Sequence, residues 1–121
     1  MIKFKSLNQS KQFLKILKKK KISSKYFTMY FDKELSNPTK ENNKNLNISF
    51  VMKKKIGNAV VRNKIKRKLK SAVQKIMKEK KIINLNFTYV LFGRGGVYKD
   101  KFSLIFKEVD NAFKRINQTS Y

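Results

Sequence analysis

Residues 53–70 read KKKIGNAVVRNKIKRKLK, and the hydrophobic period of the chain changes within this stretch. Before it, apolar residues alternate with polar ones, as in a strand. After Gly57 they recur every three or four residues, as in a helix. Gly57 is expected to let the chain turn between the two elements. Asn58 could either cap the helix or contact a phosphate. The stretch therefore predicts a strand–turn–helix unit.

The helix predicted over roughly 60–79 has one apolar stripe and two basic flanks. The stripe consists of Val61, Ile65, Leu69, Ala72 and Ile76. One flank carries Arg62, Asn63, Lys66, Arg67 and Lys70, and the other carries Lys64, Lys68 and Lys75. The helix is expected to bury the stripe and to present rows of cations that could follow a phosphate backbone.

The neighbouring segments extend this unit to an α/β (α+β) fold. Alternation predicts strands over 26–32, 46–52 and 87–92, with the only proline in the polar loop between the first two. Helical spacing predicts a first helix over roughly 11–20, capped by Ser10 and ending in lysines, and a last helix capped by Asp100. The order α-β-β-(β)-α-β-α, in which the bracketed strand is a short one hidden by a weak pattern, predicts a two-layer sandwich in one domain, 1–121.

The charge of the chain limits the kinds of partner that the protein can be expected to bind. Thirty-one Lys and Arg face seven Asp and Glu, which gives a net charge of +24, and residues 42–78 contain no acid. Such a surface calls for a polyanion, with nucleic acid the first candidate and an anionic membrane the second. The chain has no Cys and no His, so it lacks thiolate ligands and the commonest general base. A catalytic site in the protein itself is therefore not expected.

The use of arginine points to the same stretch. The chain has four Arg among 31 basic residues, and two of them, Arg62 and Arg67, lie in the 53–70 segment. Arginine offers planar, bidentate donors for phosphate that lysine lacks. The alternative is an ordinary solvated helix face, which would normally mix acids among the cations.

The segment resembles the RNR signature of the bacterial ribonuclease P protein subunit, roughly K-x-I-G-x-A-V-x-R-N-x-x-K-R-x-x-R. The matching residues are Lys54, Ile56, Gly57, Ala59, Val60, Arg62, Asn63, Lys66 and Arg67. Lys70 stands where the family usually has Arg. Phe13, Phe27 and Tyr30 match aromatic positions of the first helix and strand, and Gly93–Arg94 replaces an Ala-Arg pair. The resemblance covers nearly the whole chain.

The resemblance implies a left-handed βαβ crossover and a cytoplasmic ribonucleoprotein. The partner would be a catalytic RNA that removes the 5′ leader of precursor tRNA, a hydrolase reaction in which Mg²⁺ acts mainly through the RNA and none is bound by the protein alone. No membrane and no small-molecule substrate are expected. The implied RNA-binding residues are Lys54, Lys55, Asn58, Arg62, Asn63, Lys66, Arg67, Lys70 and Arg94. The implied leader-binding cleft consists of Phe13, Leu17, Thr28, Tyr30 and Val51.

The residues leave local alternatives open. Tyr26, Thr28 and Tyr30 are predicted to share one strand face, where aromatics beside lysines could hold a single strand. Phe13 and Leu17 could instead be core residues. The lysine run 18–21 could attract RNA or simply be solvated. Residues 93–96 are interpreted as a turn rather than a phosphate loop.

Other functions compete with this interpretation. Asp32 and Glu34 could together bind a metal, although two exposed acids at a strand end explain them as well. A ribosomal or RNA-chaperone protein would carry the same charge without a role in tRNA processing. A self-sufficient nuclease would need a base or a metal cluster. An architectural DNA binder would need a minor-groove wedge or a basic dimer.

Overall fold

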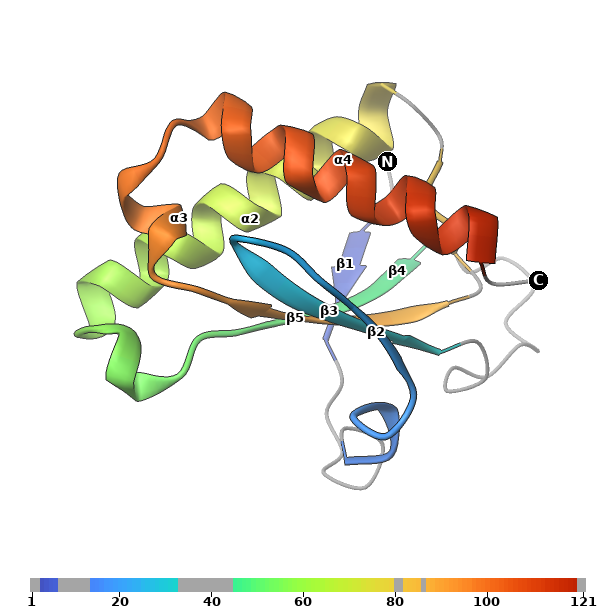
Figure 1. The fold of residues 1–121 in the computed structure, drawn as a ribbon, viewed down its shortest axis with the longest axis horizontal. Helices are drawn as coiled ribbons and strands as arrows, with labels where there is room; N and C mark the ends of the chain where they lie inside the picture. The colour runs from blue at the N-terminus through green and yellow to red at the C-terminus, as the bar shows by residue number, and fades with distance from the viewer. Residues whose placement is uncertain (1–2, 7–13, 33–44, 80–81, 86, 120–121) are drawn as a thin grey trace.

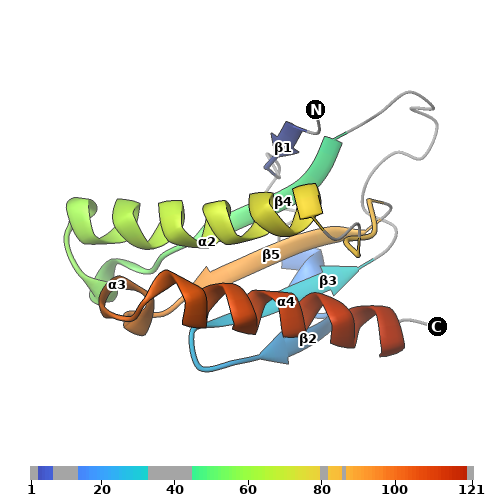
Figure 2. The ribbon, with the colours of Figure 1, turned by 90° about the horizontal axis from the view of Figure 1, so that it is seen from above.

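The computed structural model describes residues 3–6, 14–32, 45–79, 82–85 and 87–119. The strands are β1 (Lys3–Lys5), β2 (Lys20–Ser23), β3 (Phe27–Asp32), β4 (Asn45–Val51) and β5 (Thr88–Gly93). The helices are the 3₁₀ turn η1 (Lys54–Ile56), α2 (Ala59–Glu79), α3 (Gly96–Lys99) and α4 (Phe102–Thr119). The strands form one mixed sheet, and α2 and α4 cover one of its faces (Figures 1 and 2). The predicted α+β architecture is confirmed.

The sheet has the order β1-β4-β5-β3-β2. β5 is central, parallel to β4 and antiparallel to β3. Leu91 pairs with both Met29 and Phe50, so these three side chains lie on the same face of the sheet. Because α2 connects β4 to its parallel neighbour β5, the three elements form a βαβ unit.

The core lies between this face of the sheet and the two long helices. From α2, Ile65, Leu69, Ala72, Val73 and Ile76 are buried, and Val61 is partly buried. From α4, Ile105, Val109, Ala112, Phe113 and Ile116 are buried. The stripe predicted for the helix over 60–79 is therefore confirmed, and the buried residues of α4 likewise recur at helical spacing.

The opposite face of the sheet is partly covered by a short segment of the chain. Residues 14–19 lie on the side away from α2 and α4 (Figure 1). Ile16 and Val90 are fully buried, yet neither belongs to the main core cluster. This second, smaller buried layer explains why both faces of the strand predicted at 87–92 are apolar.

Two strands of the sheet were not predicted. The predicted helix over 11–20 is wrong at its C-terminal end, because residues 14–16 are helical whereas Lys20 and Lys21 belong to β2. The backbone of β2 pairs with that of β3, and Ile22 packs into the core. β1 is also additional. Both extra strands come before β3, whereas the predicted order α-β-β-(β)-α-β-α placed one extra strand after the strand predicted at 46–52. The predicted cap, Ser10, lies outside the described residues.

Tyr26 and Asp100 have roles that differ from those predicted. Tyr26 precedes β3 and is a core residue, so it does not share the outer face with Thr28 and Tyr30. Its hydroxyl donates a hydrogen bond to Asp100 Oδ2. Asp100 follows α3 and α4 begins at Phe102, so the carboxylate binds the tyrosine and does not cap the last helix.

Two glycines allow close packing of α2. Gly57 lies between η1 and α2, where its backbone is extended, with φ 161° and ψ −172°. A Cβ there would lie 3.1 Å from Val61 Cβ. At Gly93 a Cβ would lie 2.6 Å from Met52 Sδ and 3.0 Å from Ile65 Cγ2. The absence of side chains therefore lets the helix start and the end of β5 approach their neighbours.

Candidate nucleic-acid interface

The start of α2 is fixed by Asn58. Its Oδ1 accepts a hydrogen bond from the Val61 amide at 3.0 Å, and its carbonyl accepts one from the Arg62 amide at 3.0 Å. Of the two alternatives for Asn58, the cap is the one that the structure shows. Arg62 Nε also lies 3.4 Å from the Asn58 carbonyl oxygen. The first cation of the helix is thereby held close to the positive end of the helix dipole.

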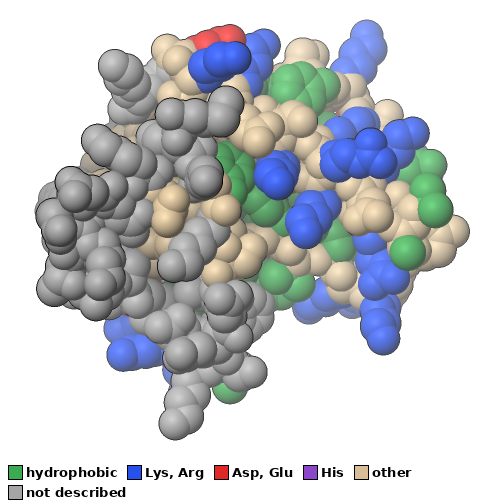
Figure 3. Space-filling view, turned by 180° about the vertical axis from the view of Figure 1, so that it is seen from behind, with side chains coloured by type: hydrophobic (Ala, Val, Ile, Leu, Met, Phe, Trp, Pro, Cys, Tyr) green, Lys and Arg blue, Asp and Glu red, His purple; other side chains and the backbone are tan. Residues whose placement is uncertain are grey.

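The outward flank of α2 forms a basic recess against β4. A pocket of about 210 Å³ is lined by Phe50, Met52, Ala59, Arg62, Asn63 and Lys66. Further along the helix, the Lys70 ammonium lies 6.0 Å from the centre of the Phe4 ring. Arg67 is exposed on the same helix. Figure 3 shows Lys and Arg side chains gathered around hydrophobic ones on one half of the back of the molecule.

The other flank of α2 has a structural role. The Lys68 ammonium donates hydrogen bonds to the carbonyl oxygens of Val97, Tyr98 and Asp100, at 3.0, 3.2 and 2.9 Å. Lys75 lies 4.9 Å from the centre of the Phe106 ring. These lysines fasten α2 to α3 and α4, whereas the Arg62 flank faces outward.

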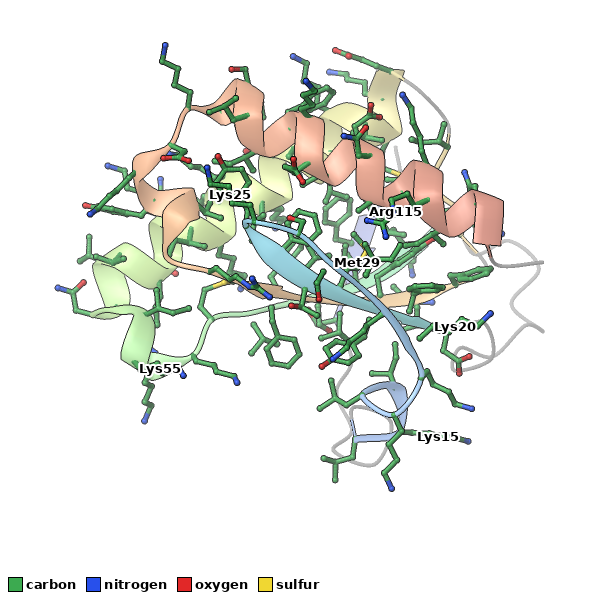
Figure 4. All side chains as sticks on the ribbon, viewed as in Figure 1. Lys15, Lys20, Lys25, Met29, Lys55 and Arg115 are labelled. Carbon is green, nitrogen blue, oxygen red and sulfur yellow. The ribbon has the colours of Figure 1, made fainter. Side chains whose placement is uncertain are left out.

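A larger groove opens on the other face of the sheet, beside residues 14–19. Its volume is about 680 Å³. It is lined by Leu17, Thr28, Tyr30, Lys53, Lys55, Ile56, Phe92, Gly93, Arg94 and Gly95. Figure 4 shows Lys55 and Lys15 at different sides of the open face below the sheet. The structure thus brings five predicted site residues into one groove: Leu17, Thr28, Tyr30, Lys55 and Arg94.

Two aromatic rings and several cations shape this groove. Tyr30 and Phe92 meet edge to face, with ring centres 5.7 Å apart. The Lys21 ammonium lies 5.8 Å from the Tyr30 ring centre, and Lys53 lies 5.8 Å from that of Phe92. Arg94 Nη2 donates a 2.8 Å hydrogen bond to Thr28 Oγ1, which orients the guanidinium across the sheet. The groove therefore combines apolar rings with positive charge.

Some predicted residues lie elsewhere. Val51 is half-buried and pairs with Phe92 in the sheet, but it does not line the groove. Lys54 is exposed on η1 and lines neither pocket. Phe13 lies outside the described residues.

The prediction missed Phe92, Lys53 and Ile56, which all line the groove. The signal for Phe92 was its alternation with Leu91, which places its ring on the face opposite to that of Phe87 and Tyr89. Phe92 is half-buried, so the described chain covers this second apolar face of the strand only in part.

Acidic residues contribute little in the described parts of the chain. No group of three or more His, Cys, Asp or Glu residues that could hold a metal occurs among them. Asp32 ends β3, and Glu34 lies outside the described residues, so the proposed pair is not tested. Lys114 and Asp110 form an ion pair at 3.1 Å on α4. None of the described helices is long and apolar enough to cross a membrane.

The fold and these surfaces define a small basic α+β protein with a face suited to a polyanion. A family model described as Ribonuclease P matches residues 1–117. The ribonuclease P protein component of Carboxydothermus hydrogenoformans is 34% identical over 88 residues, which are 73% of this chain and 69% of the relative. The chain belongs to the ribonuclease P protein family, whose members are components of the RNA-based endoribonuclease of tRNA processing.

Solved structures agree with this assignment. The RNase P protein from Thermotoga maritima superimposes with a TM-score of 0.68 at 27% identity, over 93% of this chain and 97% of that one. The Staphylococcus aureus RNase P protein gives a TM-score of 0.67 at 21% identity, over 90% of this chain and 92% of that one. The second likeness concerns the fold alone.

Proposed function

We propose that this chain binds the catalytic RNA of ribonuclease P through the Arg62 flank of α2 and the 5′ leader of precursor tRNA through the groove on the open face of the sheet. The observation that carries the proposal is the groove, in which Tyr30 and Phe92 lie between cations. The family assignment supplies the RNA partner. Binding at two surfaces would join substrate and catalyst.

The groove suits a single strand better than a duplex. The half-buried rings of Tyr30 and Phe92 offer stacking surfaces to unpaired bases, and stacking contributes about 1–3 kcal/mol per base. Lys53, Lys55 and Arg94 can neutralise the phosphates between such bases. Stacking tolerates any base, so this groove would hold the leader largely through its backbone and ring faces.

The Arg62 flank suits the folded catalytic RNA. Arg62, Lys66 and Lys70 are four residues apart, so they follow one side of α2 as a row. Each phosphate contact releases counterions, which makes assembly sensitive to salt. Since no acid lines the recess beneath this row, nothing there would repel the RNA.

The chemistry itself is assigned to the RNA. Mg²⁺ would act mainly through RNA phosphates and bases, and the protein would raise affinity for the substrate without donating a catalytic group. The chain contains no His or Cys, which limits the general bases it could offer. Its described acids form no group of three or more that could hold a metal ion.

A left-handed crossover from β4 through α2 to β5 is part of the proposal. Parallel pairing of β4 with β5 supports a βαβ unit, and the strand order seen with the helices toward the viewer in Figure 2 supports the left hand. This hand is rare, since nearly all such crossovers are right-handed.

The test is cleavage of a precursor tRNA by a bacterial ribonuclease P RNA at low Mg²⁺, with and without the protein. We expect the protein to restore cleavage and to be inert without the RNA. Binding of RNA without any rescue of cleavage would instead favour a ribosomal-type RNA-binding protein.

A further inference from the structure

We propose that the pocket between β4 and α2 receives the base of an unpaired nucleotide of the partner RNA. This inference rests on the proposed function for the identity of the partner, and it assigns to the Arg62 flank a contact with a base in addition to phosphates. The pocket of about 210 Å³ is several times larger than a water molecule, so it has room for a planar group.

The inner wall of the pocket is apolar and incompletely covered. Phe50 and Met52 lie on the sheet face that packs against the helices, yet both remain half-buried. The Phe50 ring stacks on Phe4 with centres 6.4 Å apart and planes 24° apart. An aromatic ring beside cations is the kind of surface on which bases stack.

The rim of the pocket is polar and positively charged. Arg62 and Lys66, one turn apart on α2, line it, and the contact of Arg62 Nε with the Asn58 carbonyl holds that side chain near the helix start. Asn63 lies between them and offers both a donor and an acceptor. A carboxamide of this kind can pair with the edge of a base, whereas a phosphate needs only donors.

These features favour an unpaired nucleotide over a regular duplex. A duplex backbone would satisfy the cations but would leave the recess and its aromatic wall unfilled. Proteins that recognise RNA by sequence act mainly on unpaired bases, which can leave the stack and enter a pocket. A nucleotide places its phosphate near Arg62 or Lys66 while its base reaches Phe50.

The test is an NMR titration of the full chain with AMP, GMP, CMP and UMP, and with ribose 5-phosphate as the ligand that lacks a base. We expect shifts at Phe50 and Asn63, with at least one nucleotide binding about tenfold or more tightly than ribose 5-phosphate, because stacking adds to the phosphate contact. Equal affinity for ribose 5-phosphate, or shifts confined to Tyr30 and Phe92, would overturn the proposal.

Substitutions in the pocket test whether the nucleotide binds there. Asn63→Ala and Phe50→Leu should each weaken nucleotide binding several-fold, and Gln74→Ala, an exposed change on the same helix, should leave it unchanged. Should Phe50→Leu fail to fold, Asn63→Ala still decides, since Asn63 is exposed. Nucleotide affinity that is unchanged in Asn63→Ala would overturn the role of the carboxamide.

Cleavage of precursor tRNA, measured in parallel, separates this proposal from the proposed function. Rescue of cleavage without a preference for nucleotides over ribose 5-phosphate would overturn the pocket alone. Nucleotide binding at Phe50 and Asn63 without rescue would support the pocket and overturn the ribonuclease P role.

Discussion

Single residues explain why α2 lies so close to the sheet. A side chain at Gly93 would press on Met52, Ile65 and Leu69, which belong to the core or pack against it. We expect Gly93→Ala to lower the free energy of unfolding by about 1–3 kcal/mol, as overpacking does. Gly95→Ala is the control, because a Cβ there meets no atom within 4 Å and the backbone is already helical. Urea denaturation of both variants checks this, and equal stabilities would contradict it.

Tyr26 couples stability to alkaline pH. Its hydrogen bond to Asp100, together with burial and the charges of Asp100 and Glu108, raises the pKa of Tyr26 from 10.0 to about 12. Between these values the unfolded chain loses the phenol proton while the folded protein keeps it. The free energy of unfolding is therefore expected to fall as pH rises from 10 to 12, and this contribution is fully present below pH 10.

Tyr26→Phe removes this ionisation and is the control for all other effects of pH on stability. The difference in unfolding free energy between wild type and Tyr26→Phe should shrink from pH 9.5 to pH 12. A difference that stays constant across this range would show that the phenol is not linked to folding.

At the scale of elements, α2 divides its cations between two tasks. Lys68 binds three carbonyl oxygens around α3, and Lys66, on the other side, lines the recess. Lys68→Met should lower the unfolding free energy by about 1–3 kcal/mol, since hydrogen bonds to a charged group are lost. Lys66→Met should leave stability nearly unchanged. Thermal denaturation of the two variants provides the comparison, and equal melting temperatures would refute the division.

RNA affinity should respond in the opposite way: substitutions on the Arg62 flank should weaken binding, and substitutions on the structural flank should not. Arg62→Ala, Arg67→Ala and Lys66→Met are each expected to weaken assembly with the catalytic RNA and to reduce the slope of log K against log salt by about one. Lys75→Met, on the structural flank, should leave the slope unchanged. Filter binding at several salt concentrations measures the slopes, and identical slopes for all variants would remove the phosphate contacts from this flank.

Elements whose hydrophobic pattern extends over many residues could be predicted from the sequence, and short elements could not. α2, α4 and the strands β3 to β5 follow their patterns because each buries one continuous face. β1 and β2 have few apolar residues, and lysines at sheet edges conceal them. Both flanks of α2 are basic, and the structural role of Lys68 could not be predicted from the sequence, since its contacts come from residues about 30 positions away.

At the scale of the whole molecule, the groove depends on segments that are distant in sequence. Leu17, Tyr30, Lys53 and Phe92 come from four different parts of the chain. The resemblance to the family pointed to Thr28 and Tyr30, but Phe92 and Lys53 emerged only when the strands were placed side by side. Periodicity assigns a residue to a face, and only the order of the strands brings residues of one face together.

The groove predicts discrimination between precursor and mature tRNA. Tyr30→Ala and Phe92→Ala should each reduce affinity for precursor tRNA several-fold in the holoenzyme, in line with the loss of one stacked base. Affinity for mature tRNA should not change, because it lacks the leader. Tyr98→Ala is the matched control, since this ring is exposed beside Lys64 and lies outside the groove. An equal loss for both tRNAs would argue against leader binding.

The central position of β5 also bears on how the protein is made. Among the described strands, β1 pairs with β4 and β2 pairs with β3, and only β5 joins the two pairs. In a nascent chain that has not yet exposed residues 88–93 to solvent, these two strand pairs therefore cannot share one sheet. Until that strand emerges from the ribosome, a highly basic chain without its complete sheet is surrounded by ribosomal RNA, so completion of β5 marks the point at which this sheet can close.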